Sequence, residues 1–182
     1  MFVTVNHIPA PGDGGPALEA RFRQRQRLVD QLPGFRAFEL LRPRGDGEYL
    51  VMTSWESRAD FDAWRTTPQQ RPVRPAQAGH LSHADMASWP SFHETTVEAY
   101  ADEWPPRRET AITIERVDEP PRQLVLDEGC VSAQVLRLVE GEWSDTIGSP
   151  YLLVRRWSVS PPVSAPAYDI LQPSYAALTS SR

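Results

Sequence analysis

The stretch MFVTVNHIPAPG, residues 1–12, begins the pattern that decides the fold. Its β-branched and aromatic residues predict a strand over Phe2–Ile8, and the prolines and glycines that follow end it. Because side chains alternate between the two faces of a strand, Asn6 shares a face with Phe2 and Ile8, while His7 lies on the other face. The chain therefore starts with a strand that presents an amide among apolar side chains.

A helix is predicted next, over residues 17–32, because apolar side chains recur there at helical spacing. Phe22 belongs to this stripe, and Arg25 lies in it as well. Pro33 and Gly34 end the helix. Two strands follow at residues 35–41 and 49–55, joined by Arg44-Gly-Asp-Gly47, which is typical of a hairpin turn.

A second helix is predicted to begin at Ser57, which forms an S-x-x-D cap with Asp60. This helix carries Phe61 and Trp64. Three prolines between residues 68 and 75 prevent it from continuing unbroken. A last strand is predicted over residues 92–100.

The order β-α-β-β-α-β is the ferredoxin-like pattern, an α+β fold in which both helices cover one face of the sheet. The other face must also be buried, most simply against a second copy of the chain. We therefore predict a homodimer that forms a dimeric α/β barrel. The predicted dimer face consists of Val3, Val5, Val51 and Val97.

The chain is predicted to divide into a ferredoxin-like domain at residues 1–104 and a β-rich extension at residues 105–182. Segments 110–117, 122–126, 131–139 and 151–159 have strand character. Since four short strands cannot easily bury both faces alone, we expect them to pack on the first domain, extending its sheet or covering its pocket. The tail from residue 160 is rich in Pro, Ser and Ala, and we expect it to be extended or disordered.

Composition excludes several functional classes. The 182 residues carry a net charge of −5, with a pI near 5.4, which argues against a general nucleic-acid or anionic-membrane binder. The absence of lysine excludes Schiff-base chemistry through a lysine side chain. A single cysteine, Cys130, with no signal peptide and no long apolar run, predicts a cytoplasmic protein.

Five stretches carry a resemblance to a known family: VTVNHIPAPG (3–12), LEARFRQR (18–25), PGFRAFELLRP (33–43), YLVMTSWES (49–57) and FDAW (61–64). Together they resemble the antibiotic biosynthesis monooxygenase superfamily and, within it, the IsdG-like haem-degrading monooxygenases. The resemblance covers about residues 1–100. It implies an oxidoreductase that uses O2 and an electron donor and binds haem.

The resemblance also implies roles for particular residues. Asn6 matches an asparagine that hydrogen-bonds oxygen at the haem iron, and Trp64 matches a tryptophan that packs against the haem and distorts it. Arg25 lies where a guanidinium can meet haem propionates. We expect Phe22 and Phe61 to line the same pocket.

The sequence departs from the family pattern at the iron ligand. The family histidine falls at Val73 or Arg74, or at Gln77 if a short insertion is allowed. Imidazole is the usual nitrogen ligand of haem iron, and neither glutamine nor arginine replaces it well. His80, as the candidate metal ligand, and His83 remain the nearest alternatives.

Three hypotheses follow from this departure. In the first, the chain binds haem through His80 or His83 and degrades it with O2 and a reductant. In the second, the same pocket holds a polyketide-type phenol and oxidises it to a quinone without any cofactor. In the third, the domain is a non-catalytic dimer that binds a small aromatic ligand.

Overall fold

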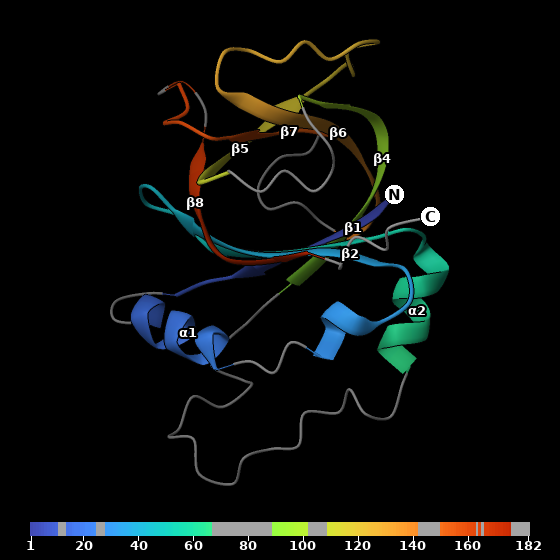
Figure 1. The fold of residues 1–182 in the computed structure, drawn as a ribbon, viewed down its shortest axis with the longest axis vertical. Helices are drawn as coiled ribbons and strands as arrows, with labels where there is room; N and C mark the ends of the chain where they lie inside the picture. The colour runs from blue at the N-terminus through green and yellow to red at the C-terminus, as the bar shows by residue number, and fades with distance from the viewer. Residues whose placement is uncertain are drawn as a thin grey trace, which may run out of the picture.

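The computed structural model describes residues 1–10, 14–24, 28–66, 89–101, 109–141, 150–162, 164 and 166–175. In this part of the chain, eight strands close into one barrel in the order β1-β3-β2-β8-β5-β7-β6-β4 (Figure 1). The strands are β1 (Phe2–Ile8), β2 (Phe35–Pro43), β3 (Tyr49–Trp55), β4 (Trp89–Tyr100), β5 (Ala111–Val117), β6 (Cys130–Gly141), β7 (Tyr151–Trp157) and β8 (Ala167–Tyr175). The helices are α1 (Gly14–Arg23), the short 3₁₀ helix η1 (Leu28–Gln31) and α2 (Arg58–Thr66).

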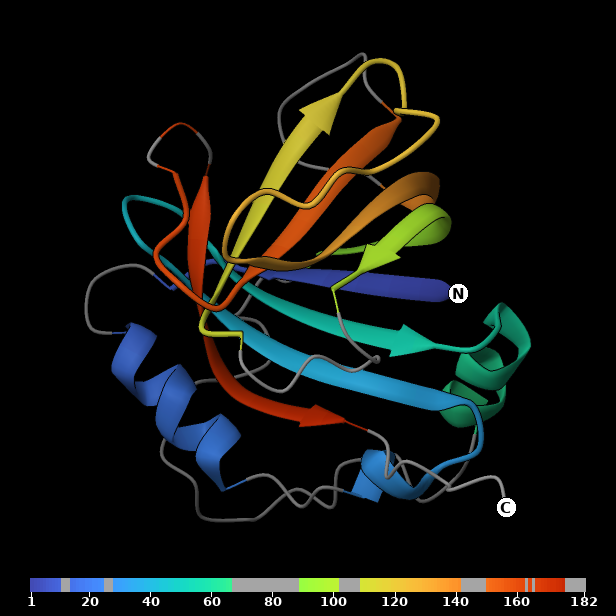
Figure 2. The same cartoon turned by 45° about the horizontal axis from the view of Figure 1, so that its top comes forward.

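The first half has the predicted ferredoxin-like arrangement. Its strands lie in the order β4-β1-β3-β2, and all neighbours are antiparallel. Both helices lie on the same side of this sheet, below it in Figure 1, and Figure 2 shows α2 at the right-hand end of β3 and β2. Phe2 and Ile8 pack with Leu18 of α1 and Phe61 of α2, which confirms the face predicted for this side of β1.

Local sequence explains how the two helices begin. The Oγ of Ser57 accepts a hydrogen bond from the backbone N–H of Asp60 at 3.2 Å, so the predicted cap of α2 is formed. The other helix starts earlier than predicted, at Gly14, and ends at Arg23 rather than near residue 32; residues 25–27 lie outside the described part. A Cβ on Gly15 would lie 2.8 Å from the Tyr49 hydroxyl, so glycine permits α1 to approach β3 closely.

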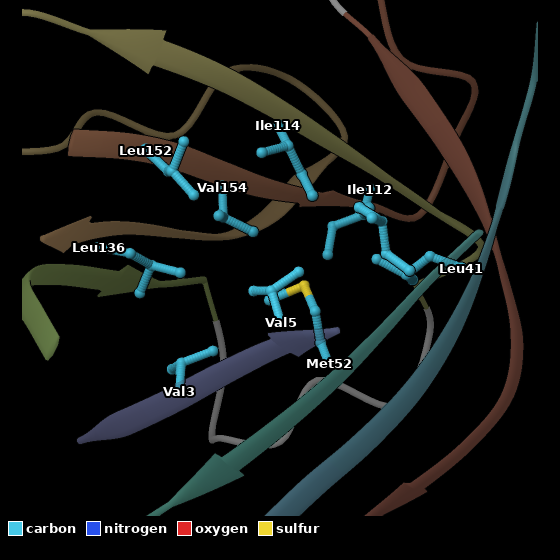
Figure 3. Close-up of a cluster of buried hydrophobic side chains, with 10 residues drawn as sticks. Val3, Val5, Leu41, Met52, Ile112, Ile114, Leu136, Leu152 and Val154 are labelled. Carbon is cyan, nitrogen blue, oxygen red and sulfur yellow. The ribbon is translucent and has the colours of Figure 1, made fainter. Parts of the chain in front are cut away.

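The barrel interior is an apolar core built equally from both halves of the chain. Figure 3 shows these side chains pointing toward one another from opposite walls. The first half contributes Val3, Val5, Leu41, Leu50 and Met52, and the second half contributes Ile112, Ile114, Leu136, Leu152 and Val154.

This core corrects the predicted dimer face. Val3 and Val5 are fully buried against the chain's own second half. Val51 packs instead with the aromatic residues on the helix side of the sheet, and Val97 packs in a separate cluster near Leu124. The predicted barrel is therefore present, but one chain supplies both of its walls.

In the second half, one segment differs from its prediction and another confirms one of the predicted alternatives. Residues 122–126 form no strand, because Pro120 and Pro121 precede them and their Leu124 packs against the outer face of β6 and β7 instead. The tail was expected to be extended, wrapping a neighbour, or disordered; residues 167–175 are extended as β8, which pairs with β2 on one side and β5 on the other. The boundary predicted at residue 104 lies outside the described residues.

Two groups of polar side chains are buried inside the barrel. The Nε and Nη2 atoms of Arg156 donate to the carboxylate of Glu39 at 2.7 Å each, and Nη1 donates to the Oε1 of Gln134 at 2.8 Å. Elsewhere in the interior, the Nε2 of His93 lies 2.9 Å from the Ser91 hydroxyl. Within each group, these hydrogen bonds pair buried polar side chains with one another.

The buried histidine predicts an acid-sensitive fold. Burial, with a smaller effect from His7, lowers the pKa of His93 from 6.5 to about 4. Between pH 6.5 and pH 4, this histidine is protonated in the unfolded chain but not in the folded chain. The free energy of unfolding therefore decreases as the pH falls from 6.5 toward 4. We expect the loss from this group to reach about 3 kcal/mol in urea unfolding measured across this range.

The matched control is His93→Gln, which should flatten this part of the pH profile. This control is needed because the titration of Glu109 changes the stability in the opposite direction over part of the same pH range. Burial raises its pKa from 4.5 to about 7, so its contribution is present at low pH and is lost as the pH rises through that range. Identical acid slopes in the native chain and in His93→Gln would contradict the assignment.

Candidate functional site

The helix-covered face of the first sheet carries an aromatic cluster. The ring of Trp64 on α2 lies 5.2 Å from that of Trp55 on β3 and 5.6 Å from that of Phe61, measured between centroids. Phe61 in turn lies 5.4 Å from Phe2. On the α1 side, Phe22 packs against Phe38 at 5.8 Å. The two helices therefore bring flat, apolar side chains to one surface of the sheet.

One polar atom in this cluster is left without a partner. The Nε1–H of Trp64 is buried and forms no hydrogen bond in the described structure. By contrast, the Nε1–H of Trp55 donates to the Oγ1 of Thr53 at 3.0 Å. Since a buried indole N–H normally finds an acceptor, the edge of Trp64 is a natural contact for an oxygen of a bound molecule.

Asn6 lies on the same face, within the sheet rather than at its end. It pairs in register with Val51 of β3 on one side and with Pro90 of β4 on the other. In the neighbouring row, the hydroxyls of Thr4 and Thr53 lie 2.7 Å apart. The side chain of Asn6 is half-buried, and no hydrogen bond joins it to the other described residues.

The structure brings four of the predicted site residues to one face: Asn6, Phe22, Phe61 and Trp64. Arg25, His80 and His83 lie outside the described residues, so their predicted roles stay predictions. Among the residues that are described, no group of three or more metal-ligating side chains comes together.

The described histidines and the single cysteine do not face this site. His7 and His93 are buried inside the barrel, behind the sheet as seen from Trp64. The Nδ1 of His7 lies 3.3 Å from a carboxylate oxygen of Glu48, and burial lowers the pKa of this histidine. Burial raises the pKa of the Cys130 thiol, which disfavours the thiolate that would bind iron.

Sequence reasoning missed the threonine pair and Trp55. Thr4 alternates with Asn6 along β1, so its face was predictable, but its partner Thr53 depends on the register between β1 and β3. Trp55 was predicted as a strand residue, and only the packing of α2 places it against Trp64.

Carboxylates from the second half hold both helices of this site. Glu140 of β6 accepts a hydrogen bond from Arg58 at the start of α2 at 2.6 Å. Asp169 of β8 pairs with Arg42 at 2.9 Å, and Arg42 lies 3.5 Å from Glu19 of α1. Burial raises the pKa of Asp169, but Arg42 and Arg44 more than offset this, so it lies below its ordinary value.

The fold and the aromatic site together define a class. Residues 1–76 match the family model described as "Antibiotic biosynthesis monooxygenase". The chain belongs to the antibiotic biosynthesis monooxygenase family. Among its relatives, the heme oxygenase (mycobilin-producing) of Mycobacterium tuberculosis is 44% identical over 82 residues, which is 44% of this chain and 74% of that protein.

Two solved structures are similar to this chain. An anthrone oxidase-like protein shares the fold over 96% of this chain and 93% of its own, with a TM-score of 0.57 and 11% identity. The heme-degrader MhuD from Mycobacterium tuberculosis, solved with two hemes in its active site, is 40% identical over 44% of this chain and 83% of its own, with a TM-score of 0.39.

None of the helices in the described part of the chain is long and apolar enough to cross a bilayer.

Proposed function

We propose that this chain is a haem-degrading monooxygenase. The observation that carries the proposal is the 44% identity to a mycobilin-producing heme oxygenase over the segment that contains Asn6 and Trp64. Support comes from Trp64, a half-buried ring at the edge of the aromatic core formed by Trp55 and Phe61, whose buried, unpartnered N–H could meet the edge of a flat macrocycle. Oxygen activation is the chemistry that haem supplies when bound, with electrons from an external donor.

The residues of the chain would have distinct tasks in this reaction. The amide of Asn6 would donate a hydrogen bond to the reacting oxygen, where a fixed donor favours developing negative charge. Trp64 would pack against the macrocycle and set its shape. The apolar rings around it would exclude bulk water from the reacting atoms. Arg25 would pair with a carboxylate of the ligand.

The iron ligand has no histidine at the position that the family uses. We assign it to His80, with His83 as the alternative, because the positions that the family uses hold Val73 and Arg74, or Gln77. The lack of a histidine at these positions supports a second candidate function. A pocket without an iron ligand could oxidise an aromatic phenol with O2 directly, with Asn6 and Trp64 holding the substrate anion.

A haemin titration of the purified chain tests the proposal. We expect a Soret band that saturates and that disappears on aerobic incubation with a reductant. The band should be lost in His80→Ala and retained in the matched variants His83→Ala and Gln77→Ala. Uptake of haemin without its degradation would instead support a non-catalytic ligand-binding domain.

No haemin uptake at all would remove the haem proposal. The next assay is then oxygen consumption with an anthrone-type phenol and no added cofactor. Consumption that depends on Asn6 would support the cofactor-independent reaction.

A further inference from the structure

The two halves of the barrel have the same topology. Numbered within each half, the strands of the first lie in the order 4-1-3-2 (β4-β1-β3-β2), and those of the second in the same order (β8-β5-β7-β6). The halves join through β2 with β8 and through β4 with β6, so the second strand of each half meets the fourth strand of the other. This is the relation that a two-fold axis creates between two subunits.

The halves differ in what covers their outer faces. In the first, the connections after the first and third strands contain α1 and α2. In the second, the corresponding connections, residues 118–129 and 158–166, contain no helix among their described residues. The outer face of β6 and β7 is covered by Leu124 and Leu126 from the first of these connections. The helix-covered aromatic site therefore occurs on one side of the barrel.

The barrel leaves little surface for a second copy. Each strand is paired on both sides, so the described sheet has no free edge. Its interior is filled by apolar side chains from both halves. The exposed large hydrophobic residues of the described chain are Val125, Val139 and Val159, which are single valines rather than the apolar patch of an obligate interface.

The second half also reaches the helices of the site. Glu140 of β6 contacts Arg58 of α2, and Asp169 of β8 connects through Arg42 to Glu19 of α1. The Tyr49 hydroxyl adds a hydrogen bond to Glu19 at 2.8 Å. In a barrel made from two chains, the Arg58–Glu140 and Arg42–Asp169 pairs would cross between subunits.

We propose that β5–β8 is a built-in partner subunit, a helix-free ferredoxin-like unit that closes the barrel and positions α1 and α2. The chain then forms one complete site as a monomer, in place of the homodimer that its first half alone predicts. Glu140 and Asp169 are positioning residues in this arrangement. The proposal does not depend on which ligand the site takes.

Sedimentation velocity of the full chain tests the first part. We expect the mass of one chain across a wide range of protein concentration. A dimer that persists on dilution would overturn the proposal, because β5–β8 would then not take the place of a partner subunit.

Hydrogen exchange without ligand tests the positioning. Glu140→Gln should speed exchange in residues 58–66, and Asp169→Asn should speed it in residues 14–24, each about two- to five-fold, as expected for loss of partly exposed ion pairs. The control Glu119→Gln, an exposed carboxylate of the same half, should change neither segment. Exchange in both helices that is unaffected by either variant would overturn the positioning role.

A charge exchange separates positioning from general destabilisation. Arg58→Glu and Glu140→Arg should each loosen α2, and the double variant should restore native exchange in residues 58–66. All of these measurements use the apo chain, so their failure is distinguishable from failure of haemin binding.

Discussion

Replacing Arg156 with methionine is expected to lower the free energy of unfolding by about 3–5 kcal/mol, because it leaves the carboxylate of Glu39 buried without its partner. Both side chains are fully inaccessible to solvent, and both guanidinium–carboxylate hydrogen bonds are 2.7 Å long. Gln134 would lose its donor as well. Urea unfolding at neutral pH, followed by tryptophan fluorescence, measures the change.

The control for this prediction removes both charges. The double variant Glu39→Leu/Arg156→Met should recover most of the lost stability, since a buried ion pair is often replaceable by apolar residues of similar size. If the single variant unfolds at the same urea concentration as the native chain, the pair does not carry the energy assigned to it.

The second large effect concerns Asn6. Replacing it with aspartate removes the N–H donor while keeping the size of the side chain, and we expect oxidative turnover to fall by about 100-fold. Haemin affinity should change much less, because the aromatic contacts of Trp64 and Phe61 remain. Single-turnover decay of the Soret band with reductant and O2 measures the rate.

His7→Gln is the matched control for this experiment. His7 is adjacent to Asn6 in the sequence, but its side chain faces the barrel interior, where it is 2% exposed. We expect this variant to keep native turnover. Equal losses in both variants would indicate a general effect on β1, and native turnover in Asn6→Asp would remove Asn6 from the reaction.

Much of the first half was predictable because its signals are local. Alternation along β1 correctly placed Asn6 with Phe2 and Ile8, and the cap at Ser57 correctly located α2. Helical spacing placed Phe61 and Trp64 on the side of α2 that meets the sheet. These features depend on residues within a few positions of one another, which is the range over which a sequence pattern is readable.

The candidate site was predictable in part for the same reason. The sequence identified Asn6 on β1 and Phe61 and Trp64 on α2. The contact between the tilted rings of Trp64 and Trp55, and the pairing of Thr4 with Thr53, depend on how β1, β3 and α2 pack together. For an iron ligand, the sequence predicts His80 or His83, and this stays a prediction because both lie outside the described residues.

The sequence by itself determined the ferredoxin-like order of the first half, the faces of its strands and the need to bury a second sheet face. It could not show what buries that face. The tertiary structure decided this through β5–β8, with contacts such as Glu39 to Arg156, which are 117 residues apart. The physical reason is that periodicity states which side of a strand is apolar, whereas the partner depends on which distant strand pairs with it.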